Sequence, residues 1–65
     1  MKQSNENIKT TLLLVKRMIA LAEKGDAERE DVGCGILYGI VRDAAYKIKK
    51  VAESEKDVHI RKGKW

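Results

Sequence analysis

The chain has 65 residues, 14 of them basic and 10 acidic, with one cysteine and neither proline nor phenylalanine. This length allows a single domain, a lone cysteine rules out a disulfide within the chain, and no stretch approaches the roughly 20 apolar residues that span a bilayer. Because apolar burial in so short a chain only about balances the conformational entropy lost on folding, we expect self-association to complete the core.

The first predicted element is a helix over about residues 5–24. Its apolar side chains recur with the helical period and cover about half of the helical wheel. An arc this wide is broader than one neighbouring helix can cover, so we expect two neighbours. Ser4 or Asn5 would cap the start of this helix, and Gly25 would end it in the left-handed conformation.

An acidic turn is predicted over about residues 25–31. Residues 23–31 carry a formal charge of −3, whereas the segments on either side are basic. Asp26 could cap a second helix directly, or the turn could extend to Asp31 if Gly33 delays helix formation. Either alternative predicts two antiparallel helices joined as a hairpin.

The second predicted helix covers about residues 31–60. Apolar residues at alternating steps of three and four mark the face that we expect to contact the first helix: Cys34, Leu37, Val41, Ala44, Ile48 and Val51. At 1.5 Å per residue this helix would be about 45 Å long, against about 30 Å for the first, so it would overhang its neighbour. The tail 61–65 is predicted to be irregular, with Trp65 either disordered or docked on a partner as an aromatic anchor.

These elements predict an all-α fold in which residues 1–65 form one antiparallel helical hairpin. Two copies would pair as a homodimeric four-helix bundle, because the second copy covers the apolar arc that a lone hairpin leaves open. The expected core consists of Leu12, Val15, Met18, Ile19, Leu37, Val41, Ala44, Ile48 and Val51.

The stretch GCGILYG at residues 33–39 gives the first candidate site. Glycine inside a helix costs about 1 kcal/mol relative to alanine, so close packing or a position in the turn must explain it. Gly35 and Gly39 lie opposite the apolar stripe and form a shallow notch, which either a helix of the dimer or a binding partner could enter. The candidate binding surface, suited to a peptide, an anion or a flat ligand, comprises Gly35, Tyr38, Gly39, Arg42, Asp43 and Tyr46.

Cys34 and His59 give the second candidate site. Taken singly, Cys34 is expected to be a small buried residue and His59 an exposed one. If the second helix paired antiparallel with its copy about a centre near residues 46–47, Cys34 would lie level with the copy's His59, with Glu55 one turn away, and the three could bind a transition metal. A cysteine followed 25 residues later by a histidine resembles the copper- and nickel-sensing repressors of the CsoR type, although Gly63 stands here at the position of that family's third ligand.

Basic side chains on both helices give a third candidate site, a nucleic-acid interface. Its residues are Lys9, Lys16 and Arg17 on the first helix and Lys47, Lys49 and Lys50 on the second. Glu23, Asp43 and Glu53 alternate with them, which favours an ordinary solvated face. The predicted plan is similar to that of the small RNA-binding hairpin homodimer Rop, in architecture only.

No residue set typical of an enzyme stands out. With a single histidine and two serines, a Ser-His-Asp set would be a coincidence, and a hairpin offers little room for a concave pocket. We therefore expect a non-enzymatic helical interaction or regulatory protein without a cofactor, acting in the cytoplasm as a homodimer and possessing no membrane segment. Nucleic-acid binding through the basic faces and metal or thiol sensing at Cys34 and His59 are the alternatives.

Overall fold

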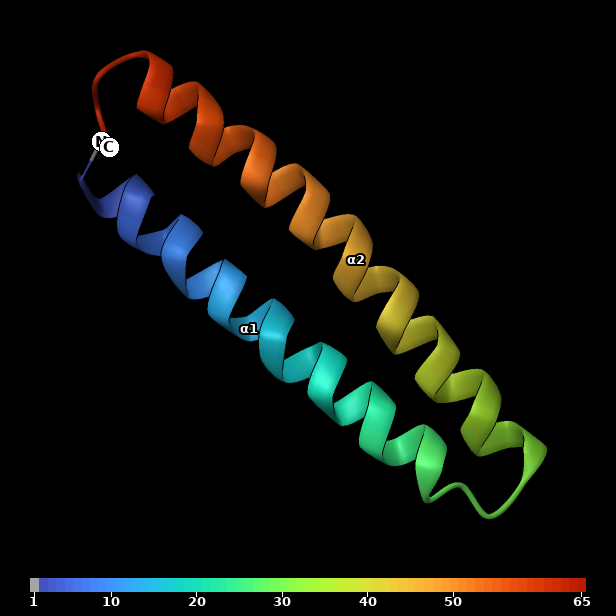
Figure 1. Ribbon diagram of the computed structural model, residues 1–65. Coiled ribbons are helices and arrows are strands. Elements are labelled where there is room, and N and C mark those ends of the chain that lie inside the picture. The colour runs from blue at the N-terminus through green and yellow to red at the C-terminus, as the bar shows by residue number, and fades with distance from the viewer. Residues whose placement is uncertain (1) are drawn as a thin grey trace.

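The computed structural model describes residues 2–65 as two long helices joined by a short turn (Figure 1). Helix α1 spans Lys2–Ala27 and helix α2 spans Val32–Arg61. They pack side by side and antiparallel in a rod with principal extents of 48 × 14 × 12 Å. The predicted all-α hairpin is thereby confirmed. Neither of these two helices is long and apolar enough to cross a membrane.

The seam between the helices is built mainly from small residues at intervals of seven. On α2 this column consists of Tyr38, Ala45, Ala52 and His59. All but the tyrosine are buried, and they face the buried Val15 and Ala22 of α1, which are again seven apart. Alanine lets the two backbones approach closely, and the interval of seven keeps each column turned toward the other helix.

The stripe predicted to contact α1 lies beside this seam. Leu37, Ile48 and Val51 are 52%, 37% and 64% exposed, so the prediction that they face α1 is wrong. Successive helical residues turn by about 100°, which places these side chains up to a quarter-turn from the alanine column, on an open face of the hairpin. The alanines take the contact between the helices, and the larger aliphatic side chains remain exposed.

The helix boundaries differ from the predicted ones. Helix α1 begins three residues earlier than expected and continues past Gly25, which is therefore a helical residue and not a left-handed terminus. Of the two predicted caps, Asp31 and not Asp26 precedes α2, and its side chain accepts a hydrogen bond of 2.8 Å from the Cys34 N–H. The helices have 26 and 30 residues, so the predicted long overhang of α2 is wrong.

Gly25 is required where α1 passes Tyr38. A Cβ atom at position 25 would lie within 3.0 Å of three atoms of the Tyr38 ring. The ring therefore packs directly on the backbone of α1, at the turn end of the seam. This close approach explains a glycine that would otherwise weaken the helix.

The tail predicted to be irregular forms a helix cap and folds back on α1. Gly63 has a φ of 69°, and the N–H groups of Gly63 and Lys64 donate to the carbonyls of Ile60 and His59, both at 2.9 Å. This is the Schellman arrangement, in which glycine supplies the left-handed residue after a helix. It directs the carbonyl of Lys64 toward α1, where Asn5 Nδ2 donates to it.

Candidate functional site

The two open faces of the hairpin differ in chemistry. One of them, here called the apolar face, consists of Leu14, Met18, Leu21, Leu37, Ile40, Ala44, Ile48 and Val51. Its leucine, isoleucine and valine side chains are between 37% and 64% exposed. A groove of about 400 Å³ runs between the helices there, with Ile8, Thr11 and Val51 in its lining and Lys47 and Glu55 as its charged members.

The hairpin exposes more surface to solvent than a compact monomeric protein of the same mass. Its accessible surface is 5066 Å², whereas a compact monomer of 7.4 kDa exposes about 4,200 Å². The excess of about 850 Å² is close to the roughly 800 Å² that each partner buries in a standard protein interface. Because the seam is formed mainly by alanines, the core of a lone hairpin is small. Burial of the apolar face would therefore stabilise the hairpin more than burial of any other part of its surface.

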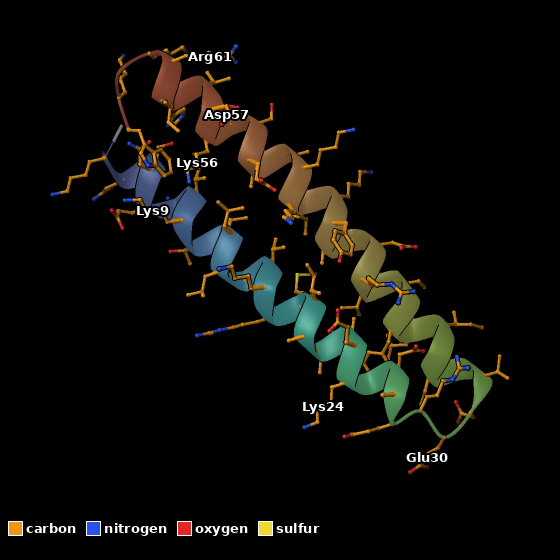
Figure 2. The ribbon with its side chains drawn as sticks, viewed as in Figure 1. Lys9, Lys24, Glu30, Lys56, Asp57 and Arg61 are labelled. Carbon is orange, nitrogen blue, oxygen red and sulfur yellow. The ribbon has the colours of Figure 1, made fainter. Side chains whose placement is uncertain are left out.

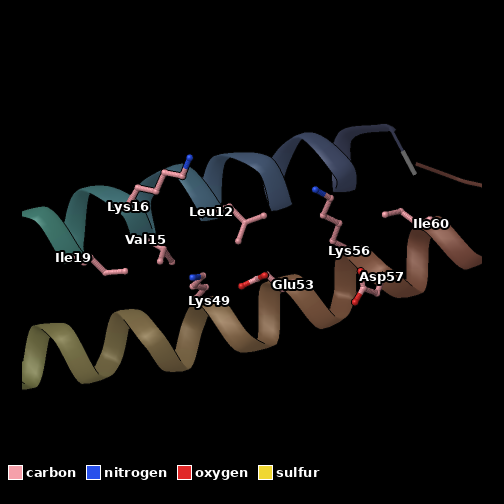
Figure 3. Close-up of a pocket in the computed structure, with 9 residues that line it drawn as sticks. All are labelled: Leu12, Val15, Lys16, Ile19, Lys49, Glu53, Lys56, Asp57 and Ile60. Atoms are coloured by element: carbon pink, nitrogen blue, oxygen red, sulfur yellow. The ribbon is translucent and has the colours of Figure 1, made fainter.

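The opposite surface, here called the charged face, contains a groove of about 500 Å³ (Figure 3). Leu12 and Ile19 project into it from α1, and Lys49 and Glu53 project into it from α2. Its remaining lining residues are Val15, Lys16, Lys56, Asp57 and Ile60. Lysines and carboxylates thus alternate along the groove, whereas a surface that binds a phosphate backbone gathers positive charge alone.

The charged face also holds part of the binding surface that was predicted around the glycines. A Cβ atom at Gly39 would meet open space, and Arg42, Asp43 and Tyr46 are exposed nearby on α2. Lys49 Nζ lies 5.9 Å from the centroid of the Tyr46 ring. These residues form a polar and aromatic strip on the outside of α2 that a partner can reach.

Two other members of that predicted surface make different contacts. Tyr38 turns into the seam and packs on Gly25, so it does not lie in line with the strip. Gly35 is covered by the side chain of Arg29, which an added Cβ atom would meet. Arg29 in turn lies 3.4 Å from a carboxylate oxygen of Asp26. Gly35 and Tyr38 therefore do not join the other predicted residues on one open surface.

The predicted metal ligands lie at opposite ends of α2. Twenty-five helical residues separate Cys34 from His59, a distance of about 37 Å along the axis. Glu55 Oε1 lies 3.9 Å from His59 Nε2, one turn away. Within residues 2–65, no three histidine, cysteine or acidic side chains gather in a way that could hold a metal ion. A site that uses both Cys34 and His59 would need two chains, as was predicted from the sequence.

His59 was expected to be an exposed helical residue, and that expectation is wrong. It is 6% exposed and Asn5 is 4% exposed. Asn5 donates through Nδ2 to the Lys64 carbonyl, so its Oδ1 faces His59, whose Nδ1 donates to it. The sequence contains a signal for this burial, because His59 follows Ala52 by seven residues in the column that forms the seam.

Trp65 lies near lysines of both helices. Lys9 of α1 and Lys56 of α2 each place Nζ 5.2 Å from the centroid of a Trp65 ring. Figure 2 shows both lysines near the same end of the hairpin, one on each helix. Lys9 Nζ also lies 3.5 Å from Glu6 Oε1. Trp65 was predicted to be either disordered or an anchor on a partner, and in this structure it lies instead against two lysines of its own chain.

The basic residues predicted to bind nucleic acid do not share one face. Lys16 and Lys49 line the groove of the charged face, whereas Lys47 lines the groove of the apolar face. Arg17 and Lys50 are exposed. The hairpin therefore does not join these side chains into a single continuous track.

Comparison of this chain with protein-family models, with curated proteins and with solved structures gives no match. Its function is therefore inferred from the chemistry of its two faces.

Proposed function

We propose that this protein is a non-enzymatic helical interaction protein that acts as a homodimer, in which the apolar faces of two hairpins pack together as a four-helix bundle. The supporting observation is the apolar face, whose aliphatic side chains are half exposed along both helices. Large contiguous apolar patches are rare on the surfaces of monomeric proteins, and they mark interaction sites.

The free energy available from burying this face is of the same order as the free energy that association costs. Full burial of a leucine, isoleucine or valine side chain contributes about 1.5–3 kcal/mol. Leu14, Leu21, Leu37, Ile40 and Val51 are each about half exposed, so two copies together gain on the order of 10 kcal/mol by burying them. Association costs about 4–15 kcal/mol of lost freedom. The net free energy of association is therefore favourable only if the second copy covers most of the apolar face.

The charged face would then point outward on both sides of the bundle. Each copy would display the strip of Gly39, Arg42 and Tyr46, and the two strips would be related by the two-fold axis. We propose that this strip binds a partner, in keeping with a small adaptor or regulatory protein. The unpaired Cys34 suits a reducing compartment such as the cytoplasm.

The test is the molar mass in solution over a wide range of protein concentration. The wild-type chain is expected at twice its chain mass. Ile40→Glu, on the apolar face, is expected to weaken association at least 100-fold, a loss of about 2.7 kcal/mol or more, because it removes a buried side chain and buries a charge in each copy. Arg42→Glu, two residues further along α2 on the charged face, is the matched control and should retain the dimer. A wild-type chain that keeps the mass of one chain even at high concentration would overturn the proposal.

A further inference from the structure

The spacing of residues on the apolar face identifies how a second copy binds. We infer that two copies of this chain stack antiparallel through their apolar faces, with their turns at opposite ends and the two-fold axis passing through Ala44 and beside Met18. This arrangement rests on the proposed function and specifies both the partner and its register.

The apolar stripe of α2 is symmetric about Ala44. Leu37 and Val51 each lie seven residues from Ala44, and Ile40 and Ile48 each lie four residues from it. An antiparallel copy of α2 centred there sets Leu37 against Val51 and Ile40 against Ile48, while Ala44 meets its own copy. A two-fold interface must be self-complementary in this way, and a small residue on the axis allows the helices to approach.

The apolar stripe of α1 has a centre of its own. Leu14 and Leu21 lie on either side of a midpoint next to Met18. When α1 pairs antiparallel with its copy about this midpoint, Leu14 meets Leu21 and the two Met18 side chains lie together near the axis. The flexible thioether of methionine suits such a position, since it fills irregular gaps.

The two centres lie at nearly the same height on the rod. Contacts within the hairpin set this height, because Asn5 is level with His59 and Gly25 is level with Tyr38. By the same register, Ala44 is level with residues 19–20 of α1. This position is about 2–4 Å, along the helix axis, from the centre found for the α1 stripe. A single two-fold axis therefore satisfies both helices, although the two stripes were located independently.

Charge at the ends of the rod selects the orientation. Residues 23–31, at the turn, contain five acidic and two basic side chains, and residues 56–65, at the far end, contain four basic and one acidic. With the turns at opposite ends, the acidic turn of each copy lies over the basic end of the other. With the turns at the same end, two acidic segments would lie side by side. Complementary charge suppresses wrong orientations of this kind.

This register also bears on the candidate metal site. Cys34 lies ten residues before Ala44 and is therefore level with residue 54 of the second copy, whereas His59 is five residues further along. His59 is also buried against Asn5 within its own hairpin. The antiparallel dimer therefore does not bring Cys34 and His59 together.

Disulfide cross-linking tests the register. Both variants are made with Cys34→Ser: Ala44→Cys at the proposed axis, and Tyr46→Cys on the charged face as the matched control. Packed helices lie about 8–10 Å apart, with Cα atoms about 2.3 Å from each axis, so facing Cα atoms are about 3.4–5.4 Å apart, which overlaps the range that a disulfide spans. Under oxidised glutathione, Ala44→Cys is expected to form a covalent dimer nearly completely and Tyr46→Cys at least tenfold less.

A second readout does not depend on position 44. Leu37→Cys and Val51→Cys chains, each with Cys34→Ser, are mixed and oxidised, and the cross-linked pair that contains one of each is expected to exceed either self-pair at least tenfold. A dimeric mass with equal yields of all pairs, or with Ala44→Cys no more reactive than Tyr46→Cys, overturns the antiparallel register and leaves the proposed function standing. A monomeric mass of the wild-type chain overturns both.

Discussion

The two ends of the hairpin are closed by different kinds of contact. At the turn end, the Tyr38 ring packs on Gly25 and Asp31 caps the start of α2. At the far end, Asn5 and His59 form a buried polar pair, the Lys64 carbonyl joins it, and the terminal tryptophan lies among lysines of both helices.

This difference follows from where the chain is continuous. The turn itself keeps the helices together at one end, so close steric packing is sufficient there. The far end has no covalent connection between the helices, and the alanine column repeats every seven residues, so apolar contact alone would tolerate a slipped register. Hydrogen bonds are directional and an unmade one is costly when buried, so the pair at Asn5 and His59 specifies the register.

The largest effect on the hairpin itself is expected from breaking the polar pair. Asn5→Ala leaves His59 Nδ1 and the Lys64 carbonyl without their partner, which should lower the free energy of unfolding by about 1–3 kcal/mol. Urea denaturation at one fixed protein concentration measures this change, because association contributes to stability.

The control for that experiment lies half a turn away on the same helix. The side chain of Asn7 is exposed, so Asn7→Ala should change the free energy of unfolding by less than about 0.5 kcal/mol. Equal effects of the two substitutions would mean that the far end is closed by general helix stability and not by the buried pair.

The hairpin could be predicted from the sequence because both helices carry long apolar periodicities and an acidic, glycine-containing turn separates them. The rotation of α2 about its own axis, which decides which of its side chains face α1, could not be predicted. Its apolar residues cover an arc that includes both the alanine column and the larger stripe of Leu37, Ile48 and Val51, and periodicity alone does not select which of them faces α1. Whether the alanine column or the larger stripe faces α1 depends on how closely the two backbones approach. That distance is a property of the pair of helices, and neither helix sets it alone.

For the candidate site too, the sequence predicts which residues are neighbours on one helix but not which residues meet between the helices. Gly39, Arg42 and Tyr46 share a face because they are neighbours on one helix, which local spacing shows. Tyr38 leaves that surface because Gly25, on the other helix, gives its ring a place to pack. The burial of His59 likewise depends on Asn5, 54 residues away in the chain. Such contacts follow from the relative placement of the helices.

An intermediate effect is expected at the turn end, where the same substitution at two glycines should have opposite signs. Gly25→Ala must displace the Tyr38 ring, an overpacking cost of about 1–3 kcal/mol that the better helix propensity of alanine offsets by about 1 kcal/mol. A net loss of about 1 kcal/mol in the free energy of unfolding is expected. Thermal and urea denaturation measure it.

Gly39→Ala is the matched variant. An added Cβ atom there meets nothing within 4 Å, so alanine should stabilise the helix by up to about 1 kcal/mol. A loss of stability at Gly39 would instead mean that another helix packs on this glycine in the dimer, the alternative that the sequence left open. Equal gains at both glycines would show that the Tyr38 ring does not depend on Gly25.

The smallest effect is expected from the charge of the cap on α2. The N–H of Cys34 donates to Asp31 and holds the pKa of its carboxyl below the ordinary value of 3.8. A carboxyl whose pKa is lower in the folded state stabilises the fold above its unfolded pKa, and this contribution disappears as the pH falls through the folded value. Asp31→Asn keeps a capping oxygen and removes the titration.

The two chains should therefore differ in unfolding midpoint at about pH 6, with the wild type higher, and this difference should shrink as the pH falls through the folded-state pKa of Asp31. The other carboxyls are common to both chains, so their titration cancels in the difference. Because Asp31 is exposed, solvent screens its charge and the difference should be smaller than those at Asn5 and Gly25. A difference that stays constant over this range would show that the cap acts through its hydrogen bond alone, and the turn end would then be closed by contacts as insensitive to charge as those of the alanine seam.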